Sequence, residues 1–485
     1  MDEKNIPQTN KEVCFVVTGS VDAGKSSTIG VFTSLKSKND QKNTNDKMID
    51  FDDNSCLTLD NGDGSARVKV AKHPHEIKLG KTSDISSRTI ELNEKQLTFV
   101  DLCGHEKYLK TTLYGITGFF PDYGILIVSA NRGLLKMTKE HIGILLYLKI
   151  PFIVLMTRVD ITPEIISDSQ IKNIEKLLSL HKRKMEIINS HKDQNQSNID
   201  LEKKENGLVE DLKTLAKKLQ NNPYIVPLIT ISNKTGYYVK TCLRFLSYLN
   251  PRPGWGWGQN QFTNTNTNQG SIFYIDSKFT PPGIGLVLSG LVKGMDIKKN
   301  QDMLIGPFGN ELKSVRIWSI HNNNKLIIEQ LGDKQRGCLA IKSIDKKNEV
   351  TKDLIRKGMI MISNEVTQNI CYQFTASIEV LHHSTVISKK YTPVIHCGTV
   401  RQSAKIILQD EQVLQTGNRA EVRFRFIKHP EFIEPGMTFF FREGTTRGFG
   451  TIIDILCLKD DPNPKPAAAG RRRSTKYLRK GKKIN

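Results

Sequence analysis

The stretch that most constrains the fold runs from residue 16 to residue 30 and reads VVTGSVDAGKSSTIG. An apolar run, CFVVT, precedes its first glycine, and a helical pattern begins near Lys25. Gly19, Gly24, Lys25 and Ser26 match the spacing G-x-x-x-x-G-K-[ST], which predicts a phosphate-binding loop between a buried strand and a helix. Backbone N–H groups of such a loop converge on phosphate oxygens, helped by the positive end of the following helix.

This loop supplies most of the predicted phosphate contacts. Lys25 is expected to reach the β- and γ-phosphates of a nucleotide, and the Ser26 hydroxyl is expected to ligate Mg²⁺. A glycine turn without a ligand is the alternative, but the flanking strand and helix both disfavour it. The complete set of predicted phosphate-binding residues is Gly19, Ser20, Val21, Asp22, Ala23, Gly24, Lys25, Ser26, Ser27 and Gly104.

A second apolar strand, LTFVDL, ends in the run DLCGHEKYL and supplies a carboxylate. Asp101 is predicted to hold Mg²⁺ through a water, and the Gly104 N–H is predicted to sense the γ-phosphate. His105 is placed to orient an attacking water, which makes it the candidate catalytic residue. A lone histidine after a strand is usually structural, but its position downstream of a phosphate loop favours the catalytic interpretation.

Base recognition is predicted at the ends of two further strands, FIVLMT and IVPLITIS. Asp160 can accept hydrogen bonds from guanine N1–H and N2–H₂ together, which adenine does not offer. Parallel sheets bind ligands at the carboxyl ends of their strands, so these groups are expected to meet at one edge. The predicted guanine-binding residues are Thr157, Arg158, Asp160, Ser232, Asn233 and Lys234.

Strand-like and helical patterns alternate through about the first 250 residues, which predicts a doubly wound, mostly parallel α/β domain. Polar stretches at 37–72 and 189–206 are expected to be surface loops. After the run NPRPGWGWGQNQFTNTNTNQG, short strands with turn signals predict two small β-barrels. The predicted organisation is a disordered N-terminus (1–12), a GTP-binding domain (13–250), a linker (251–270), two β-barrels (271–365 and 366–459) and a disordered basic tail (460–485).

Charge and composition indicate which classes of binding partner the chain favours. The 71 Lys and Arg residues against 50 Asp and Glu give a net charge of +21, and the stretch from residue 465 onward carries nine basic residues and no acidic one. Such a segment favours RNA or an import receptor, although a solubilising tail without a partner is the alternative. Scattered cysteines and the lack of a long apolar run predict a reduced, cytoplasmic protein that does not enter membranes. We expect a monomer.

Several longer runs resemble one family. GSVDAGKSS, DLCGHEKY, TRVD and ISNKTG are similar to the guanine-nucleotide motifs of translational GTPases. HEIKLGKTSDIS, MTKEHIGILLYL and VLHHSTVISKKYTPVIHCGTVRQSA resemble the GTP-binding protein 1 and 2 subfamily, relatives of elongation factors Tu and 1A. The resemblance covers about residues 13–458. It implies a GTPase domain and two β-barrels, a water-positioning role for His105, and Thr82 as the switch threonine on Mg²⁺ and the γ-phosphate.

The chain departs from the family pattern in its fourth motif, where N-K-x-D is replaced by Thr157-Arg158-Val159-Asp160. Asp160 should keep guanine selectivity, although affinity is expected to fall. Ala23 stands where elongation factor Tu carries histidine, which leaves the backbone phosphate contacts intact. Asp22 matches an acidic residue that the family often links to a monovalent cation.

The resemblance implies tRNA and the ribosome as partners, with GTP as substrate. The last barrel offers Lys389, Lys390, Tyr391 and Arg401 as candidate RNA contacts, against the alternative of a solvated strand face. A GTP-gated RNA-binding adaptor in RNA surveillance and decay remains a second hypothesis. A signalling GTPase whose basic tail binds an anionic membrane is a third, and it lacks a lipidation signal.

Overall fold

A computed structural model describes most of the chain. It covers residues 11–35, 56–71, 73, 76–77, 82–93, 95–189, 198–252, 270–323, 326–345, 349–382, 386–388, 391–408, 413–444, 446–462 and 464. Lys389, Lys390 and the basic segment from 465 onward lie outside the described residues, as do residues 1–10 and 253–269.

The first part of the chain forms a sheet of seven strands in the order β2-β3-β1-β4-β5-β7-β6. All neighbouring strands are parallel except β2 and β3. The strands are β1 (Lys11–Gly19), β2 (Ser86–Leu92), β3 (Lys95–Asp101), β4 (Tyr123–Ser129), β5 (Phe152–Thr157), β6 (Lys184–Ile187) and β7 (Ile225–Thr230). The predicted mostly parallel α/β sheet is confirmed. Two edge strands, β2 and β6, are not among the predicted apolar runs. β2 carries only two apolar residues, Ile90 and Leu92, and β6 has no fully buried residue.

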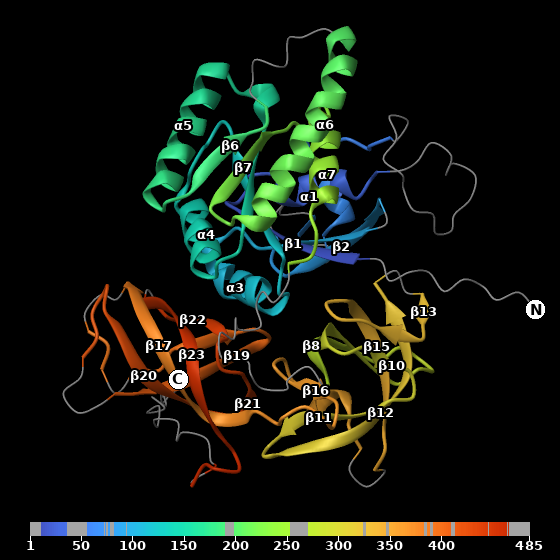
Figure 1. Cartoon of the computed structure of the whole chain (residues 1–485), viewed down its shortest axis with the longest axis vertical. Helices are drawn as coiled ribbons and strands as arrows, with labels where there is room; N and C mark the ends of the chain where they lie inside the picture. The colour runs from blue at the N-terminus through green and yellow to red at the C-terminus, as the bar shows by residue number, and fades with distance from the viewer. Residues whose placement is uncertain are drawn as a thin grey trace, which may run out of the picture.

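Helices cover both faces of this sheet, as Figure 1 shows. They are α1 (Lys25–Phe32), η2 (Ser65–Lys69), η3 (Glu106–Tyr108), α3 (Leu109–Gly118), α4 (Lys136–Tyr147), η4 (Val159–Ile161), α5 (Glu164–Leu180), α6 (Asn198–Asn221) and α7 (Val239–Tyr248). One core joins α1, α6 and α7 to the sheet, and a second joins α3, α4 and α5 to the opposite face. No helix in the described ranges is long and apolar enough to cross a membrane.

Helix α6 corrects one expectation. The stretch 189–206 was expected to be a surface loop because it is polar, yet the helix begins at Asn198. The buried residues Leu212, Leu215 and Leu219 recur at helical spacing farther along, and they pack against the sheet. A helix held by that apolar face extends into polar sequence, because its polar residues need no burial.

Two closed β-barrels follow. In the first, β8 (Ser271–Phe279), β9 (Leu286–Gly294), β11 (Asp302–Phe308), β12 (Glu311–Asn322), β15 (Arg336–Ser343) and β16 (Ile360–Ile362) form a ring closed by the β11–β12 pair. In the second, β17 (Ile370–His382), β18 (Val394–Cys397), β19 (Val400–Ile407), β20 (Arg419–Phe426), β22 (Thr438–Glu443) and β23 (Thr446–Cys457) form a ring closed by β17–β20. The remaining short elements are β10 (Ile297–Lys298), β13 (Ile327–Ile328), β14 (Gln330–Leu331), η6 (Lys352–Leu354) and β21 (Glu431–Phe432). The predicted pair of barrels is confirmed.

The α/β part rests on both barrels (Figure 1). On the first barrel, the Arg336 N–H donates to the buried Glu12 carboxylate of β1 at 2.9 Å. The Arg336 guanidinium stacks on Phe119, 4.4 Å from the ring centroid, and pairs with Asp276. On the second barrel, Arg447 pairs with Glu140 of α4. These contacts are buried or half-buried, so the three parts form one packed body.

Candidate functional site

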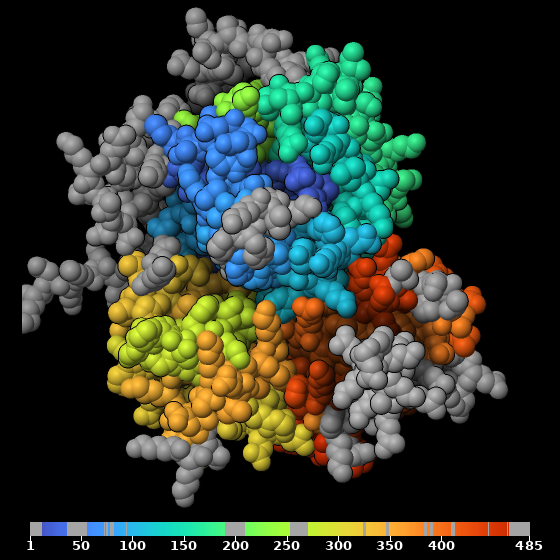
Figure 2. Space-filling model, turned by 180° about the vertical axis from the view of Figure 1, so that it is seen from behind, coloured from blue at the N-terminus to red at the C-terminus, as the bar shows by residue number. Residues whose placement is uncertain are grey.

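A cavity of about 340 Å³ opens at the carboxyl ends of the central strands. Figure 2 shows the dark blue loop after β1 on the floor of a hollow, between lighter blue and teal segments. The lining residues are Val21, Asp22, Gly24, Lys25, Ser26, Ser27, Asp60, Gly62, Asp63, Gly64, Arg67, Thr82, Gly104, His105, Thr157, Arg158, Asp160, Ile161, Asn233 and Lys234. The predicted phosphate, catalytic and guanine residues are therefore brought together at one place.

The loop between β1 and α1 depends on its glycines. Gly19 has φ 142°, and a Cβ there would lie 2.3 Å from the Ile127 carbonyl oxygen of the neighbouring strand. Gly24 has φ 97° and caps α1 in the left-handed region, which disfavours side chains with a Cβ. His141 of α4 holds the loop from behind, because its Nδ1 accepts a hydrogen bond from the Gly19 N–H at 3.1 Å. Burial lowers the pKa of His141 to about 3, so this imidazole is a neutral acceptor.

Lys25 is buried under the loop, and its Nζ donates to the Ser20 carbonyl oxygen at 2.8 Å. Burial lowers the pKa of Lys25, while the attraction of Asp101 opposes that shift. Gly104 packs directly against this ammonium, since an added Cβ would lie 2.5 Å from Lys25 Nζ and 2.8 Å from the Gly19 carbonyl oxygen. The segment after β3 is thus in contact with the phosphate loop.

Three oxygen-bearing side chains meet beside Lys25. Ser26 Oγ donates to Asp101 Oδ2 at 2.6 Å and lies 3.1 Å from Thr82 Oγ1, which is 3.3 Å from the same carboxylate oxygen. Asp101 is 2% exposed, and burial raises its pKa against the attraction of Lys25. Its Oδ1 is buried without a hydrogen-bond partner in the described part of the chain. Hard cations such as Mg²⁺ take oxygen ligands of this kind, so the donor set fits the predicted ion.

His105 lies at the exposed rim of the cavity, just after Gly104. Its Nδ1 accepts from the Lys107 N–H at 3.1 Å, and its ring meets Tyr108 edge-on with centroids 6.2 Å apart. Because Nδ1 is an acceptor, the neutral ring carries its proton on Nε2 in this arrangement. No group within the described ranges accepts a hydrogen bond from that nitrogen, so it can face a water in the cavity.

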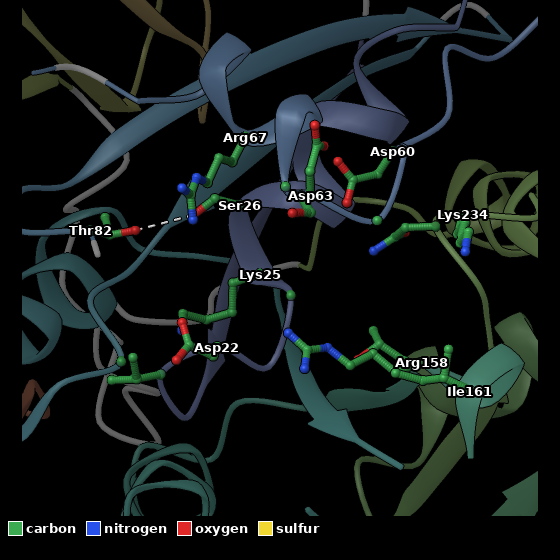
Figure 3. Close-up of a pocket in the computed structure, with 18 of the residues that line it drawn as sticks. Asp22, Lys25, Ser26, Asp60, Asp63, Arg67, Thr82, Arg158, Ile161 and Lys234 are labelled. Atoms are coloured by element: carbon green, nitrogen blue, oxygen red, sulfur yellow. Dashed lines mark hydrogen bonds between the residues drawn. The ribbon is translucent and has the colours of Figure 1, made fainter. Parts of the chain in front are cut away.

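The predicted guanine residues form the opposite end of the cavity (Figure 3). Asp160 Oδ1 accepts from Ser232 Oγ at 2.8 Å, which fixes the carboxylate. Asn233 Nδ2 donates to Thr28 Oγ1 at 2.9 Å. Thr157 Oγ1 donates to the Ala23 carbonyl oxygen at 2.7 Å. The fourth motif, although its sequence differs from N-K-x-D, therefore links β5 to the phosphate loop.

Some predicted residues support the cavity without lining it. Gly19, Ser20, Ala23 and Ser232 stand behind its wall, and Asp101 lines a small adjoining cavity shared with Ser26 and Thr82. Tyr391 and Arg401 lie on the second barrel, away from the nucleotide cavity. Tyr391 packs against the barrel core, whereas Arg401 is exposed on β19.

The segment from Asp60 to Arg67 also lines the cavity, although the sequence predicted only a polar loop there. The Asp60 N–H donates to the Asn233 carbonyl oxygen at 2.9 Å, and Asp60 Oδ1 accepts from the Ala66 N–H at 2.9 Å. Residues 60–66 read DNGDGSA, and this mixture of aspartate, asparagine and glycine is a turn and capping signal that can be detected in the sequence. What it could not show is that the turn folds over the nucleotide cavity.

A buried carboxylate organises the stretch around Thr82. Glu76 Oε1 accepts from the Ser83 N–H at 2.7 Å, from Ser83 Oγ at 2.9 Å and from the Asp84 N–H at 3.1 Å. These bonds fix the backbone next to Thr82 and so aim its hydroxyl at Asp101. Glu76 is 4% exposed and had no signal of its own in the sequence, because its partners come from a different turn.

Comparisons with known proteins agree with this geometry. Residues 10–252 match the model of the elongation factor Tu GTP binding domain. GTP-binding protein 1 of Xenopus laevis is 33% identical over 97% of this chain and 68% of its own length. GTP-binding protein 2 of Mus musculus is 31% identical over 91% of this chain and 69% of its own length.

Solved structures share the fold. A bacterial selenocysteine-specific elongation factor superposes with a TM-score of 0.60 at 16% identity, over 91% of this chain, which spans 58% of that chain. Elongation factor SelB of Methanococcus maripaludis, in complex with the GTP analogue GppNHp, has a TM-score of 0.60 at 17% identity over 94% of this chain and 81% of its own. The chain therefore belongs to the elongation factor Tu family of GTP-binding proteins, with GTP-binding proteins 1 and 2 among its relatives, as its motifs predicted.

Proposed function

We propose that this GTP-binding protein hydrolyses GTP to GDP and phosphate and acts as an elongation-factor-like switch in translation, with tRNA and the ribosome as partners. One observation carries the proposal. The phosphate loop, the Asp101 and His105 segment and the guanine residues around Asp160 arrive from separate strands and line one cavity or its immediate neighbour.

We assign the phosphates of GTP to one end of the cavity and its guanine to the other. The loop amides and Lys25 hold the phosphates, while Asp160 and the Arg158 stem hold guanine. Ser26, Thr82 and Asp101 would hold Mg²⁺, which when bound neutralises charge on the β- and γ-phosphates. The unpartnered Asp101 Oδ1 supports this role, because a buried carboxylate oxygen without a donor is costly.

Hydrolysis is assigned to His105. Its Nε2 is the nitrogen available to orient a water for attack on the γ-phosphorus. The side chain is exposed and its contacts come from its own short turn, which does not hold the ring over the cavity. We therefore expect slow turnover by the protein alone and faster turnover once a partner orients this ring.

The same segment connects the cavity to the barrels. Helix α3 begins four residues after His105 and ends at Gly118, beside the Gly398 carbonyl oxygen of the second barrel. The following Phe119 carbonyl oxygen accepts from Arg336 Nη1 of the first barrel at 3.3 Å. A change at the γ-phosphate that moves α3 would therefore change its contacts with both barrels.

An RNA partner is supported by the outer surface of the second barrel. Lys405 of β19 lies directly opposite Arg425 of β20, and Arg423 is exposed two residues away. Arg425 is already paired with Asp461 at 3.1 Å, so the exposed Lys405 and Arg423 are the cations that an anionic ligand would contact on this face. Phosphates of RNA are ligands of that kind.

The test is GTP hydrolysis measured with the full chain alone, with ribosomes, with aminoacyl-tRNA and with both. Lys25→Ala should abolish binding of a fluorescent GTP analogue, whereas the exposed helix variant Lys139→Ala should bind normally. His105→Ala should bind GTP yet lose stimulated turnover, and the double variant Lys405→Glu/Arg423→Glu should lose stimulation by tRNA. Stimulation by RNA but not by ribosomes would favour the surveillance adaptor, and an equal stimulated rate in His105→Ala would remove its catalytic role.

A further inference from the structure

We propose that Arg67 is an arginine that the chain supplies to its own nucleotide site, where it contacts the γ-phosphoryl group during hydrolysis. The inference rests on the proposed GTPase function and adds a residue that the nucleotide motifs do not contain. It follows from where the side chain lies, how its turn is fixed and what its guanidinium contacts.

Arg67 stands at the border of two cavities. It lines the nucleotide cavity, and it also lines the small adjoining cavity that contains Asp101. Ser26, Thr82 and Arg67 are the residues common to both. Figure 3 shows the Arg67 side chain reaching toward Ser26 and Thr82, with Lys25 below Ser26 and the open space beside them. The guanidinium is thus next to the hydroxyls assigned to Mg²⁺ and the γ-phosphate.

The turn that carries Arg67 is fixed on both sides. Helix η2 packs on α1 so closely that a Cβ on Gly30 would lie 2.1 Å from the Ala66 carbonyl oxygen. Asp60 caps η2 through the Ala66 N–H and is itself tied to Asn233 of the guanine motif. At the far end, Arg88 Nε donates to the Lys69 carbonyl oxygen at 2.8 Å. Arg67 is therefore presented by a short helix docked on the helix that follows the phosphate loop.

The guanidinium retains donor capacity. Its Nη2 donates to the Ile77 carbonyl oxygen at 3.3 Å, and within the described ranges it forms no ion pair with a carboxylate. A guanidinium has five N–H donors in a planar fork that matches phosphate oxygens. Besides the hydrogen bonds from Ser65, the Arg67 charge also contributes to lowering the pKa of the exposed Asp63, although the Arg67 and Asp63 side chains form no close ion pair. An anionic ligand in the adjoining cavity can therefore compete for this guanidinium.

The chemistry needs a cation at this position. Water oxygen forms a bond to the γ-phosphorus, the bond from that phosphorus to the β–γ bridging oxygen breaks, and the proton of the water passes to the released phosphate or to solvent. Negative charge spreads over the γ-phosphoryl oxygens in the transition state. Arg67 gives and takes no proton, and its positive charge would stabilise the negative charge on these oxygens.

The experiment compares Arg67→Ala, Arg67→Lys and Arg88→Ala in the full chain. Arg88→Ala is the matched control, because it removes an arginine that anchors the same η2 helix without lining either cavity. Affinities for fluorescent GDP and GTP analogues are measured first, followed by the single-turnover rate of GTP hydrolysis at saturating protein. Arg67→Ala should keep GDP affinity within about threefold of wild type and lower the hydrolysis rate about 100-fold or more.

Arg67→Lys should recover part of the rate, because it keeps the charge but loses the fork. Two results would overturn the inference. One is an unchanged rate in Arg67→Ala, with or without a loss of nucleotide affinity, and the other is an equal fall in Arg88→Ala, which would mean that only the shape of η2 matters. Failure of wild-type protein to hydrolyse GTP would instead refute the proposed function and is seen before any variant is compared.

Discussion

The contact between α1 and η2 can be tested with a single methyl group. In Gly30→Ala, the new Cβ would lie 2.1 Å from the Ala66 carbonyl oxygen and 2.6 Å from its carbonyl carbon. Ordinary contact begins near 3.4 Å. The two backbones must separate by about 1 Å, and both are held, one by its helix and the other by Asp60 and Asn233.

The magnitude follows from two opposing effects. Replacing glycine by alanine inside a helix normally stabilises it by about 1 kcal/mol. Forcing extra volume into a packed contact costs about 1–3 kcal/mol, and here the cost should be about 2–3 kcal/mol because the obstacle is backbone rather than a flexible side chain. We expect a net destabilisation of about 1–2 kcal/mol and displacement of the segment from Asp60 to Arg67 away from the cavity. Nucleotide affinity should fall about 5- to 30-fold if the displaced turn loses that much binding free energy.

Gly143→Ala is the matched control. Gly143 also lies within a helix, α4, but its added Cβ would meet only Tyr147 Cε2, at the ordinary distance of 3.8 Å. This variant should show the helix gain without the clash. Urea unfolding followed by circular dichroism and titration with a fluorescent GDP analogue are measured for both. Equal stabilisation in the two variants, with nucleotide affinity unchanged in Gly30→Ala, would show that the docking of η2 on α1 does not shape the site.

Two further predictions concern single buried groups. Thr157→Val removes the hydrogen bond to the Ala23 carbonyl oxygen with little change of shape, so the affinity for GDP should fall about 5- to 10-fold. Thr33 is the control, because its hydroxyl donates to the Ile29 carbonyl oxygen of its own helix. Thr33→Val should leave the affinity for GDP unchanged in the same titration. Burial raises the pKa of Glu431 from 4.5 to about 7, although its ion pair with Arg356 opposes the shift, so its contribution to stability is fully present below pH 4.5 and is lost as the pH rises through 7. The free energy of unfolding should therefore fall across that window, and Glu431→Gln should flatten the profile in urea titrations; a wild-type slope in the variant would assign the pH dependence to another group.

The sequence by itself determined the elements whose signals are local. The glycine spacing from Gly19 to Ser26 predicts a loop, because positive φ and close backbone approach are properties of those residues. The apolar runs ending at Asp101, Thr157 and Ser232 predict parallel strands, and parallel strands of a doubly wound sheet open their ligand site at one edge. Short alternating strands with turn signals likewise predict the two barrels.

Other features were decided only by the tertiary structure. Strand β2 has few apolar residues, so only the structure shows that it pairs with β3. The start of α6 is polar, so only the structure shows that it continues the helix whose later residues are buried. Glu76 and Asp60 look like ordinary polar loop residues, yet each becomes a fixed support once distant backbone N–H groups surround its carboxylate. Arg67 belongs to the nucleotide cavity because Ala66 packs on Gly30, a contact between segments 36 residues apart. Local spacing encodes backbone conformation and burial, whereas contacts of this kind depend on how the folded elements pack, which no local pattern records.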